Sequence, residues 1–351
     1  MAIPNVGQDP SMEVALATKM QLVLDQPMSD ISTKLVNKDF EGDFFKIGDT
    51  VSIVKPIPES IAVEIGELNG KVLASNVAEN VGQVGKQKDA RLVATDASFT
   101  KTTLQIDKYA KYAFILSDIT KAEGKWNYES GNLDLAAQQM RKMHNILTAQ
   151  AIVEDTAIRQ QQDTEGLALG KPNAPVQLKN ADELYEKILV PMHSALYDRG
   201  CITADGQITY GSNPQEGKAT SGAIFMPAKA YNLFLTSKYF TDRSTTAADD
   251  KVATGNVAKV LGLEVNVEPA LDPKAKRHVT VASIADGALI IVAGTSNCVT
   301  RANKVLTPDS FRSHERFGTE FHGLEIFGEK VFTPEAAVVA YVKLPVETPA
   351  A

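Results

Sequence analysis

The chain has 351 residues, of which 44% are hydrophobic and 23% are charged. This composition excludes wholesale disorder and allows two domains, or one elongated domain with an insertion. The net charge of −7 is dispersed, without the basic stripe that a nucleic-acid groove usually carries. The N-terminus lacks the features of a signal peptide, and no run of eighteen apolar residues occurs. We therefore expect a protein that is made in the cytoplasm and does not span a membrane.

The N-terminal part of the chain predicts an arm followed by a hairpin. Residues 1–30 are polar and turn-rich, with a short amphipathic helix that starts at Glu13 and stops before Pro27. Residues 48–58 and 61–65 predict strands, and residues 91–95 lead the chain back. Between them, residues 66–90 are rich in glycine and poor in aromatic residues, which is typical of a long protruding loop. The pattern predicts a stretched β-hairpin whose tip projects from the body.

Residues 102–119 predict one long strand, because apolar residues alternate with polar ones along both of its halves. The strand leads into a helix predicted over residues 132–162, with Asn132 as its N-cap. At 1.5 Å per residue this helix would be ~46 Å long, which suits an extended, flat subunit. Its predicted apolar stripe consists of Leu133, Ala136, Met140, Met143, Leu147, Ala151 and Ile158.

The second half of the chain predicts an α+β arrangement. A helix over 181–200 should be kinked by Pro191 and ended by Gly200. From residue 223 onward, a buried strand, a helix over 228–240 and a polar loop precede predicted strands within 255–269, 278–284 and 288–294. The last of these is dense in Val and Ile, which predicts a central strand buried on both faces. The tail from residue 313 again has a strand-like pattern, and we expect the C-terminus to fray.

Catalytic and metal-binding motifs are not evident. Residues 211–220 lack the spacing of a phosphate loop, and residues 287–297 lack the glycine pattern of a dinucleotide site. His314 and His322, with Glu315, Glu320 and Glu325 nearby, are the one conceivable metal cluster, but such dispersed sets usually form only local hydrogen bonds. Cys201 and Cys298 are the only cysteines and have no spacing for a zinc site. We expect no enzyme activity, no cofactor and no metal.

The order of these elements resembles the major capsid proteins of tailed bacteriophages, which share the Hong Kong 97-type fold with bacterial encapsulin shells. The resemblance covers nearly the whole chain, although each motif is a soft pattern of glycines and apolar positions. The segments that carry it are 48–56 (GDTVSIVKP), 104–120 (LQIDKYAKYAFILSDIT), 133–152 (LDLAAQQMRKMHNILTAQAI), 225–235 (FMPAKAYNLFL), 255–271 (GNVAKVLGLEVNVEPAL) and 323–339 (GLEIFGEKVFTPEAAVV).

The resemblance implies an α+β chain with an arm, an E-loop hairpin, a peripheral domain built on the long spine helix, and an axial domain. The implied bounds are the arm at 1–47, the peripheral domain at 48–56 and 104–221, the E-loop at 57–103, the axial domain at 222–325, returning strands of the peripheral domain at 326–345, and a frayed C-terminus at 346–351. Such chains form hexamers and pentamers that close into an icosahedral shell around a double-stranded DNA genome.

The resemblance also implies contacts between subunits. The candidates are Lys71, Lys86, Lys88 and Arg91 of the E-loop, with Leu16 and Met20 of the arm. Some relatives cross-link an E-loop lysine to a neighbouring asparagine, but solvated loop charges are the ordinary alternative for these lysines. Implied partners are a separate scaffolding protein, a portal, decoration proteins and packaged DNA, which is contacted weakly and without sequence specificity. The implied location is the virion, assembled in the bacterial host cytoplasm.

Two alternatives stay open at this point. An encapsulin-like compartment shell would share the fold but enclose an enzyme instead of a genome. A two-domain cytoplasmic enzyme, with its site between residues 102–200 and 222–310, is the alternative of a different class. The absence of catalytic motifs argues against the enzyme.

Overall fold

The computed structural model describes residues 20, 30–38, 47–56, 64–66, 72–75, 99–118, 128–208, 221–241, 259–306, 309–314 and 316–345. The chain divides into two compact units, one of residues 50–105 and one of residues 1–49 and 106–351. The expected arm helix apart from Met20, the strand at 91–95 and the segment 211–220 lie outside the described residues. None of the described helices is long and apolar enough to cross a membrane.

The smaller unit contains the stem of the predicted hairpin. β2 (Thr50–Pro56) pairs antiparallel with β5 (Phe99–Gln105) over its whole length. Val51, Ile53 and Leu104 are buried, in keeping with the period of two. β3 (Glu64–Gly66) and β4 (Val72–Ser75) form a second antiparallel pair. β4 lies within residues 66–90, which the sequence predicted as a long protruding loop.

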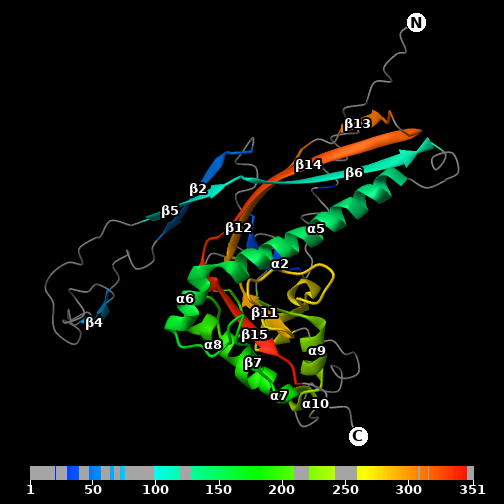
Figure 1. The fold of residues 1–351 in the computed structure, drawn as a ribbon. Coiled ribbons are helices and arrows are strands. Elements are labelled where there is room, and N and C mark those ends of the chain that lie inside the picture. The colour runs from blue at the N-terminus through cyan, green and yellow to red at the C-terminus, as the bar shows by residue number, and fades with distance from the viewer. Residues whose placement is uncertain are drawn as a thin grey trace, which may run out of the picture. The chain divides into compact units, whose positions relative to one another are not determined.

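In the larger unit, a five-stranded sheet is centred on β14 (Gly318–Val331) (Figure 1). β14 pairs antiparallel with β6, β12 and β13 at different points along its length, and β1 pairs parallel with β12. The bounds are β6 (Lys108–Ser117), β12 (Val299–Val305), β13 (Asp309–Arg312) and β1 (Val36–Asn37).

The predicted strand 102–119 is two strands, because the ladder changes partner at Ile106. The Ile106 amide donates to the Asp49 carbonyl at 2.9 Å, and its carbonyl accepts from the Gly48 amide at 2.8 Å. Gly48 can take part because its φ of +96° suits glycine. The predicted alternation is nevertheless confirmed, since Leu104 and Ile106 are buried, as are Tyr112 and Leu116.

The long helix begins earlier than predicted and is interrupted once. α5 (Tyr128–Glu154) is followed by α6 (Thr156–Thr164), and Figure 1 shows α5 running along the five-stranded sheet. Asp155 separates them: its carboxylate accepts from the Ala157 and Ile158 amides at 2.8 and 3.0 Å and so caps α6. The predicted cap, Asn132, lies inside α5.

A six-stranded sheet forms the other part of the larger unit, and the predicted central strand, β11, lies within it. The order is β7-β15-β11-β8-β10-β9, and all seven residues of β11 are buried. The bounds are β7 (Val176–Gln177), β15 (Ala337–Lys343), β11 (Ala288–Gly294), β8 (Ala223–Met226), β10 (Leu263–Val267) and β9 (Lys259–Val260).

One expectation about strands differs from this sheet, because residues 278–284 form no strand. β15 pairs with β11 and β7. The first six residues of β15 are buried, which suits a strand covered on both faces. β14 pairs along β6 in the other sheet.

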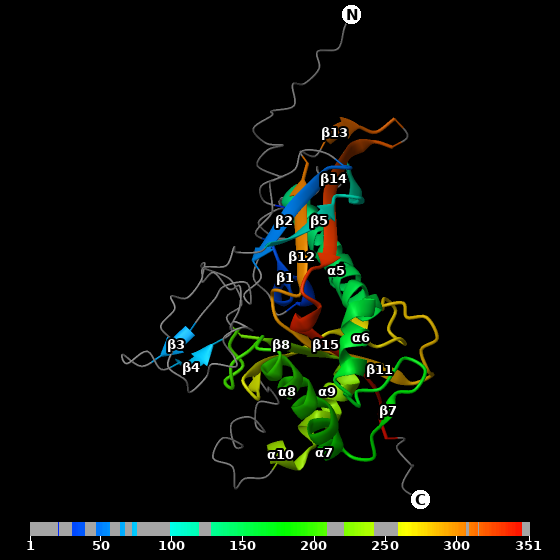
Figure 2. The ribbon, with the colours of Figure 1, turned by 90° about the vertical axis from the view of Figure 1, so that its left-hand side faces the viewer.

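Both faces of the six-stranded sheet are covered (Figure 2). Alternate residues such as Ile224, Ile291 and Ala340 pack against the α7–α8 segment and α9 on one face. Phe225 and Val339 pack on the other face, in a core with α2 and the C-terminal end of α5. The bounds are α2 (Ile31–Lys34), α7 (Ala181–Leu184), the π-turn η2 (Tyr185–Leu189), α8 (Val190–Asp198), α9 (Ala228–Leu235) and α10 (Lys238–Thr241).

The predicted helix 181–200 is continuous but irregular. α7 passes through the π-turn η2 into α8, and Pro191 lies in the first turn of α8. A proline cannot donate to the carbonyl of the preceding turn, and the wider turn before it accommodates that loss. Gly200 has a φ of +66° and ends the helix as predicted.

Candidate functional site

Of the predicted contact residues, only Met20 lies within the described residues. Lys71, Lys86, Lys88, Arg91 and Leu16 lie outside them.

Met20 was predicted to contact another subunit, but its side chain is fully buried in its own chain. It packs in one cluster with Tyr112 of β6 and with Leu133 and Met140 of α5. A flexible thioether suits this gap between strand and helix. Burial in this cluster raises the pKa of Tyr112 to about 12. Met20 is therefore a core residue of its own subunit.

Glu315 of the conceivable metal cluster lies outside the described residues, and no group of three that could hold a metal ion occurs within the described ones. Glu320 and His322 share one face of β14, with 3.3 Å between His322 Nε2 and Glu320 Oε2. Glu325 is an odd number of residues away, so it points to the opposite face and is fully buried there. Cys201 and Cys298 are free thiols, and burial raises the pKa of Cys298.

A layer of buried polar side chains joins α5 to the five-stranded sheet; we call it the α5 polar layer. At its centre, Glu325 of β14 receives two hydrogen bonds. One is with His144 Nε2 at 2.9 Å, and the other comes from Asn303 Nδ2 at 3.0 Å. The layer comprises the buried residues Ser32, Arg141, His144, Asn145, Thr148, Arg301, Asn303 and Glu325, the buried side chain of Glu329, and Asp30, whose side chain is 27% exposed.

Two ion pairs extend this layer, one within the five-stranded sheet and one toward the start of α2. Arg301 of β12 donates to the Glu329 carboxylate, at 2.9 Å from Nε, and also to the Thr148 hydroxyl on α5. Arg141 of α5 pairs with Asp30, the residue before α2, at 2.6 Å. The layer thus ties α5 to β12, to β14 and to the start of α2.

The ionised state of Glu325 follows from its partners. Burial alone would raise the pKa of this carboxyl group, but the hydrogen bond and charge of His144, the hydrogen bond from Asn303 and the charge of Arg301 hold it below its ordinary value. The layer therefore contains a buried carboxylate rather than a neutral acid.

This layer was not predicted, because the predicted apolar stripe of α5 includes Met143 and Leu147, whereas the buried face carries His144 and Thr148. Met143 and Leu147 were predicted to be buried, yet they are 45% and 37% exposed. His144 and Thr148 take those places and are buried. The available signal was their spacing of four and eight residues from Met140, but polar residues are ordinarily assigned to the outer face.

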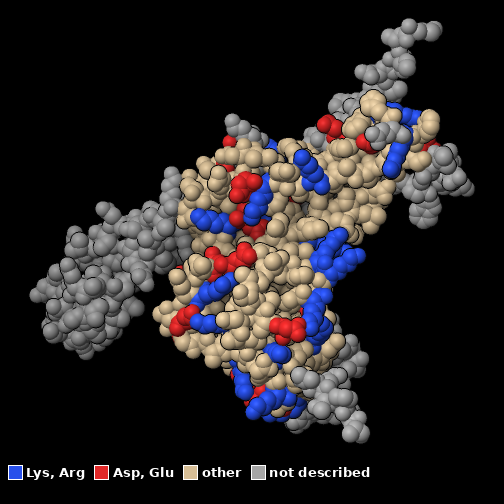
Figure 3. Space-filling view, viewed as in Figure 1, with Lys and Arg blue, Asp and Glu red and all other residues tan. Residues whose placement is uncertain are grey.

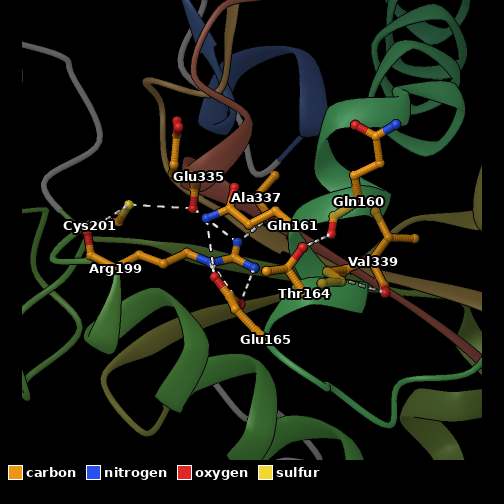
Figure 4. Close-up of polar contacts among 10 residues, drawn as sticks. Gln160, Gln161, Thr164, Glu165, Arg199, Cys201, Glu335, Ala337 and Val339 are labelled. Atoms are coloured by element: carbon orange, nitrogen blue, oxygen red, sulfur yellow. Dashed lines mark hydrogen bonds and ion pairs between the residues drawn. The ribbon is translucent and has the colours of Figure 1, made fainter.

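A second polar joint, the Arg199 clamp, lies where α6, α8 and β15 meet (Figure 4). Arg199 follows α8, and its Nε and Nη2 donate to the Glu165 carboxylate at 2.9 and 2.6 Å. Its Nη1 donates to the carbonyls of Glu335 and Ala337 at 3.1 and 2.9 Å. The hydrogen bond from Arg199 is the main cause that holds the pKa of Glu165 below its usual range. A planar, five-donor guanidinium is suited to joining three elements in this way.

The third feature is an open pocket of about 300 Å³ near the turn between β13 and β14; we call it the tip pocket. Phe317, in the same turn, is 83% exposed. The pocket is lined by Ala113, Phe114, Ile115, Ser313, Arg316, Glu320 and His322.

The surface charge fits the dispersed pattern of the sequence. On the face drawn in Figure 3, basic and acidic side chains are interspersed, many of them side by side. The buried charged groups of the α5 polar layer pair with one another and join elements of the fold. Among the described residues, these contacts stabilise the arrangement of α5, β12 and β14.

No protein-family model matches this sequence, and no curated protein matches it. The structure is similar to solved structures from bacteriophages. The structure from Mycobacterium phage Che8 has a TM-score of 0.54 at 16% identity, over 89% of this chain and 90% of the other. The mature capsid of bacteriophage PhiM1 has a TM-score of 0.50 at 9% identity, over 92% of this chain and 89% of the other. The chain therefore has the Hong Kong 97-type capsid fold that the sequence implied.

Proposed function

We propose that this chain is the major capsid protein of a tailed bacteriophage. In this proposal it assembles as hexamers and pentamers into an icosahedral shell that encloses a double-stranded DNA genome. The observation that carries the proposal is the likeness to the PhiM1 mature capsid over about nine-tenths of both chains. A match over about nine-tenths of both chains concerns the whole subunit rather than one common motif.

The joints inside the subunit are consistent with this role. The α5 polar layer and the Arg199 clamp fix α5, α6 and both sheets to one another through buried, directional contacts. A shell subunit repeats each of its contacts in every copy, so a fixed relation between its elements favours closed symmetry. The arm at 1–47 and the E-loop at 57–103 would supply contacts to neighbouring copies, with scaffolding, portal and decoration proteins as separate partners.

The test is electron microscopy of the purified chain under assembly conditions, together with size-exclusion chromatography. We expect ring-shaped capsomers or closed shells of uniform diameter. A chain that stays monomeric under every assembly condition would overturn the proposal.

Particles isolated from the cells in which the chain is naturally made test the content of the shell. Nuclease-protected double-stranded DNA inside the particles is the expected result. Protein cargo in place of DNA would support the compartment shell instead.

A further inference from the structure

A loop of residues 272–287 lies beside α5 and is fixed to its exposed face (Figure 1). Arg277 Nη1 donates to Gln139 Oε1 on α5 at 2.8 Å. Further along the helix, the side-chain amide of Gln150 donates to the Thr280 carbonyl at 2.9 Å and accepts from the Thr280 amide at 3.1 Å. These contacts hold the loop in one position along α5.

This joint brings three cations together on one exposed surface, which we call the basic patch. Lys276 and Arg277 belong to a basic run at residues 274–278 (KAKRH). Gln139, which accepts from Arg277, is three residues before Lys142 on α5, so these two helix side chains are neighbours. The patch consists of Lys142, Lys276 and Arg277, all of them exposed.

The carboxylates of the loop do not neutralise the basic patch, because other lysines occupy them. Asp272 pairs with Lys229 at 2.7 Å, and Asp286 pairs with Lys274 at 3.0 Å. Within the described ranges, no carboxylate forms an ion pair with the three cations of the patch.

The carboxylates of α5 are too far away to neutralise Lys142. The nearest ones along the helix are Asp134 and Glu154, eight and twelve residues from Lys142, which corresponds to ~12 and ~18 Å. Both distances exceed the Debye length of about 8 Å at physiological salt. The patch is therefore locally positive on a chain whose net charge is −7.

We propose that the basic patch binds the phosphate backbone of packaged double-stranded DNA, so that this side of α5 lines the interior of the shell. The inference rests on the proposed shell function and names the surface that meets the genome. Exposed cations without carboxylate partners suit phosphates, which are bound without reading the base sequence. The sequence showed no basic stripe because the patch joins distant segments: Arg277 lies 138 residues from Gln139.

The salt dependence of DNA binding tests the basic patch. The variant that combines Lys142→Gln, Lys276→Gln and Arg277→Gln removes its three charges. Fluorescence anisotropy of a labelled duplex DNA with the purified full-length chain measures the binding constant over a series of salt concentrations. We expect the slope of its logarithm against the logarithm of the salt concentration to become shallower by about 2–3, because each phosphate contact contributes about 0.9.

The matched control removes the same number of charges elsewhere on the surface, from lysines that pair with carboxylates. It combines Lys171→Gln, Lys187→Gln and Lys238→Gln. The control should keep the wild-type slope, and circular dichroism should show both variants folded. An equally shallow slope in the control would show that net charge governs binding and would overturn the assignment to the patch.

Lysine acetylation of wild-type particles locates the contact without any substitution. Read by mass spectrometry, Lys142 and Lys276 should be protected in DNA-filled particles and reactive in particles from which the DNA has been released. Lys171, which is exposed and outside the patch, should react equally in both. Equal reactivity of the patch lysines in both particles overturns the inference. Protection that persists after release of the DNA indicates a protein on the patch and also overturns it.

The outcomes separate this inference from the function that it rests on. If DNA-filled shells form but the triple variant keeps the wild-type slope, the DNA contact is overturned and the shell function stands. If the wild-type chain forms no shells, or forms shells that hold protein in place of DNA, the proposed function fails and this contact fails with it.

Discussion

At the scale of single residues, Arg199 and Glu325 show how charge is used inside this subunit. Both make several hydrogen bonds to different elements, and both are largely shielded from water. Replacing a buried ion pair by apolar groups often leaves the free energy of unfolding unchanged. Removing only one partner lowers it, because an uncompensated charge stays buried. The net contribution of such a pair to stability is therefore modest, whereas a substitution that removes one partner is costly.

Substitution of Arg199 tests the clamp. Arg199→Ala leaves the Glu165 carboxylate and two carbonyls without their donor, so we expect a loss of about 2–3 kcal/mol in the free energy of unfolding. Arg199→Lys should recover only part of it, because lysine lacks the planar fork. Lys171→Ala is the control, since the pair of Lys171 with Asp163 is exposed and should contribute little. Urea unfolding of the isolated subunit measures all three, and equal losses in Arg199→Ala and Lys171→Ala would contradict the clamp.

Substitution of Glu325 tests the α5 polar layer through its pH dependence. The folded state lowers the pKa of Glu325, so its ionised form stabilises the fold above the ordinary carboxyl value of 4.5. That contribution is lost as the pH falls through the lowered value. We expect Glu325→Gln to destabilise the subunit by about 2–4 kcal/mol near neutral pH.

The difference in the free energy of unfolding between the wild type and Glu325→Gln should become smaller at acid pH. Urea unfolding at a series of pH values measures it. Glu320→Gln is the matched control on the exposed face of the same strand, and its effect near neutral pH should be small. If the difference in the free energy of unfolding stays constant across the acid range, the carboxylate charge of Glu325 does not stabilise the layer.

At the scale of elements, the six-stranded sheet shows why some strands were easy to predict. β8 and β11 are apolar at every position, and a strand with both faces covered needs nothing else to be recognised. The sheet partner of β15 could not be predicted in the same way. Apart from Lys343, its sequence is as apolar as that of β11, and the pairing of the two depends on contacts between residues far apart in the chain.

Deletion of residues 67–89 tests the expected role of the E-loop. A glycine-rich segment that is poor in aromatic residues cannot offset its own ordering entropy, so we expect it to order against neighbouring copies. The deleted subunit should remain soluble and folded by circular dichroism but should fail to form shells in electron microscopy. Loss of the folded signal would place this segment in the core of its own subunit.

At the scale of the whole molecule, the described residues join their elements through apolar cores and buried ion pairs rather than covalent bridges. Cys201 and Cys298 are free thiols, and no group of three ligating side chains converges in the described ranges. Repeated modest contacts suffice for a closed shell, because symmetry multiplies small free energies.

Chemical treatment of assembled particles tests this view of shell cohesion. We expect the particles to survive both EDTA and a reducing agent, as measured by electron microscopy and light scattering before and after treatment. Untreated particles held for the same time are the control. Disassembly by EDTA would reveal a metal site, and disassembly by the reducing agent would reveal a bridge between subunits through Cys201 or Cys298.

The sequence by itself determined the fold class and the order of the elements. The period of two in β6, the apolar run of β11 and the glycine that ends α8 are local signals, and the structure confirms each of them. These signals depend only on neighbouring residues, so they can be read without the rest of the chain.

The tertiary structure alone decided the polar contacts and the tip pocket. His144 lies 181 residues from Glu325, and Arg199 lies 34 residues from Glu165, so nothing in the local pattern of either pair indicates the other. Burial of a charged residue is tolerated only where an oppositely charged or hydrogen-bonding partner lies at the right distance and angle. A sequence pattern assigns such residues to the surface, and only the folded arrangement of α5, β14 and β15 shows that they belong inside.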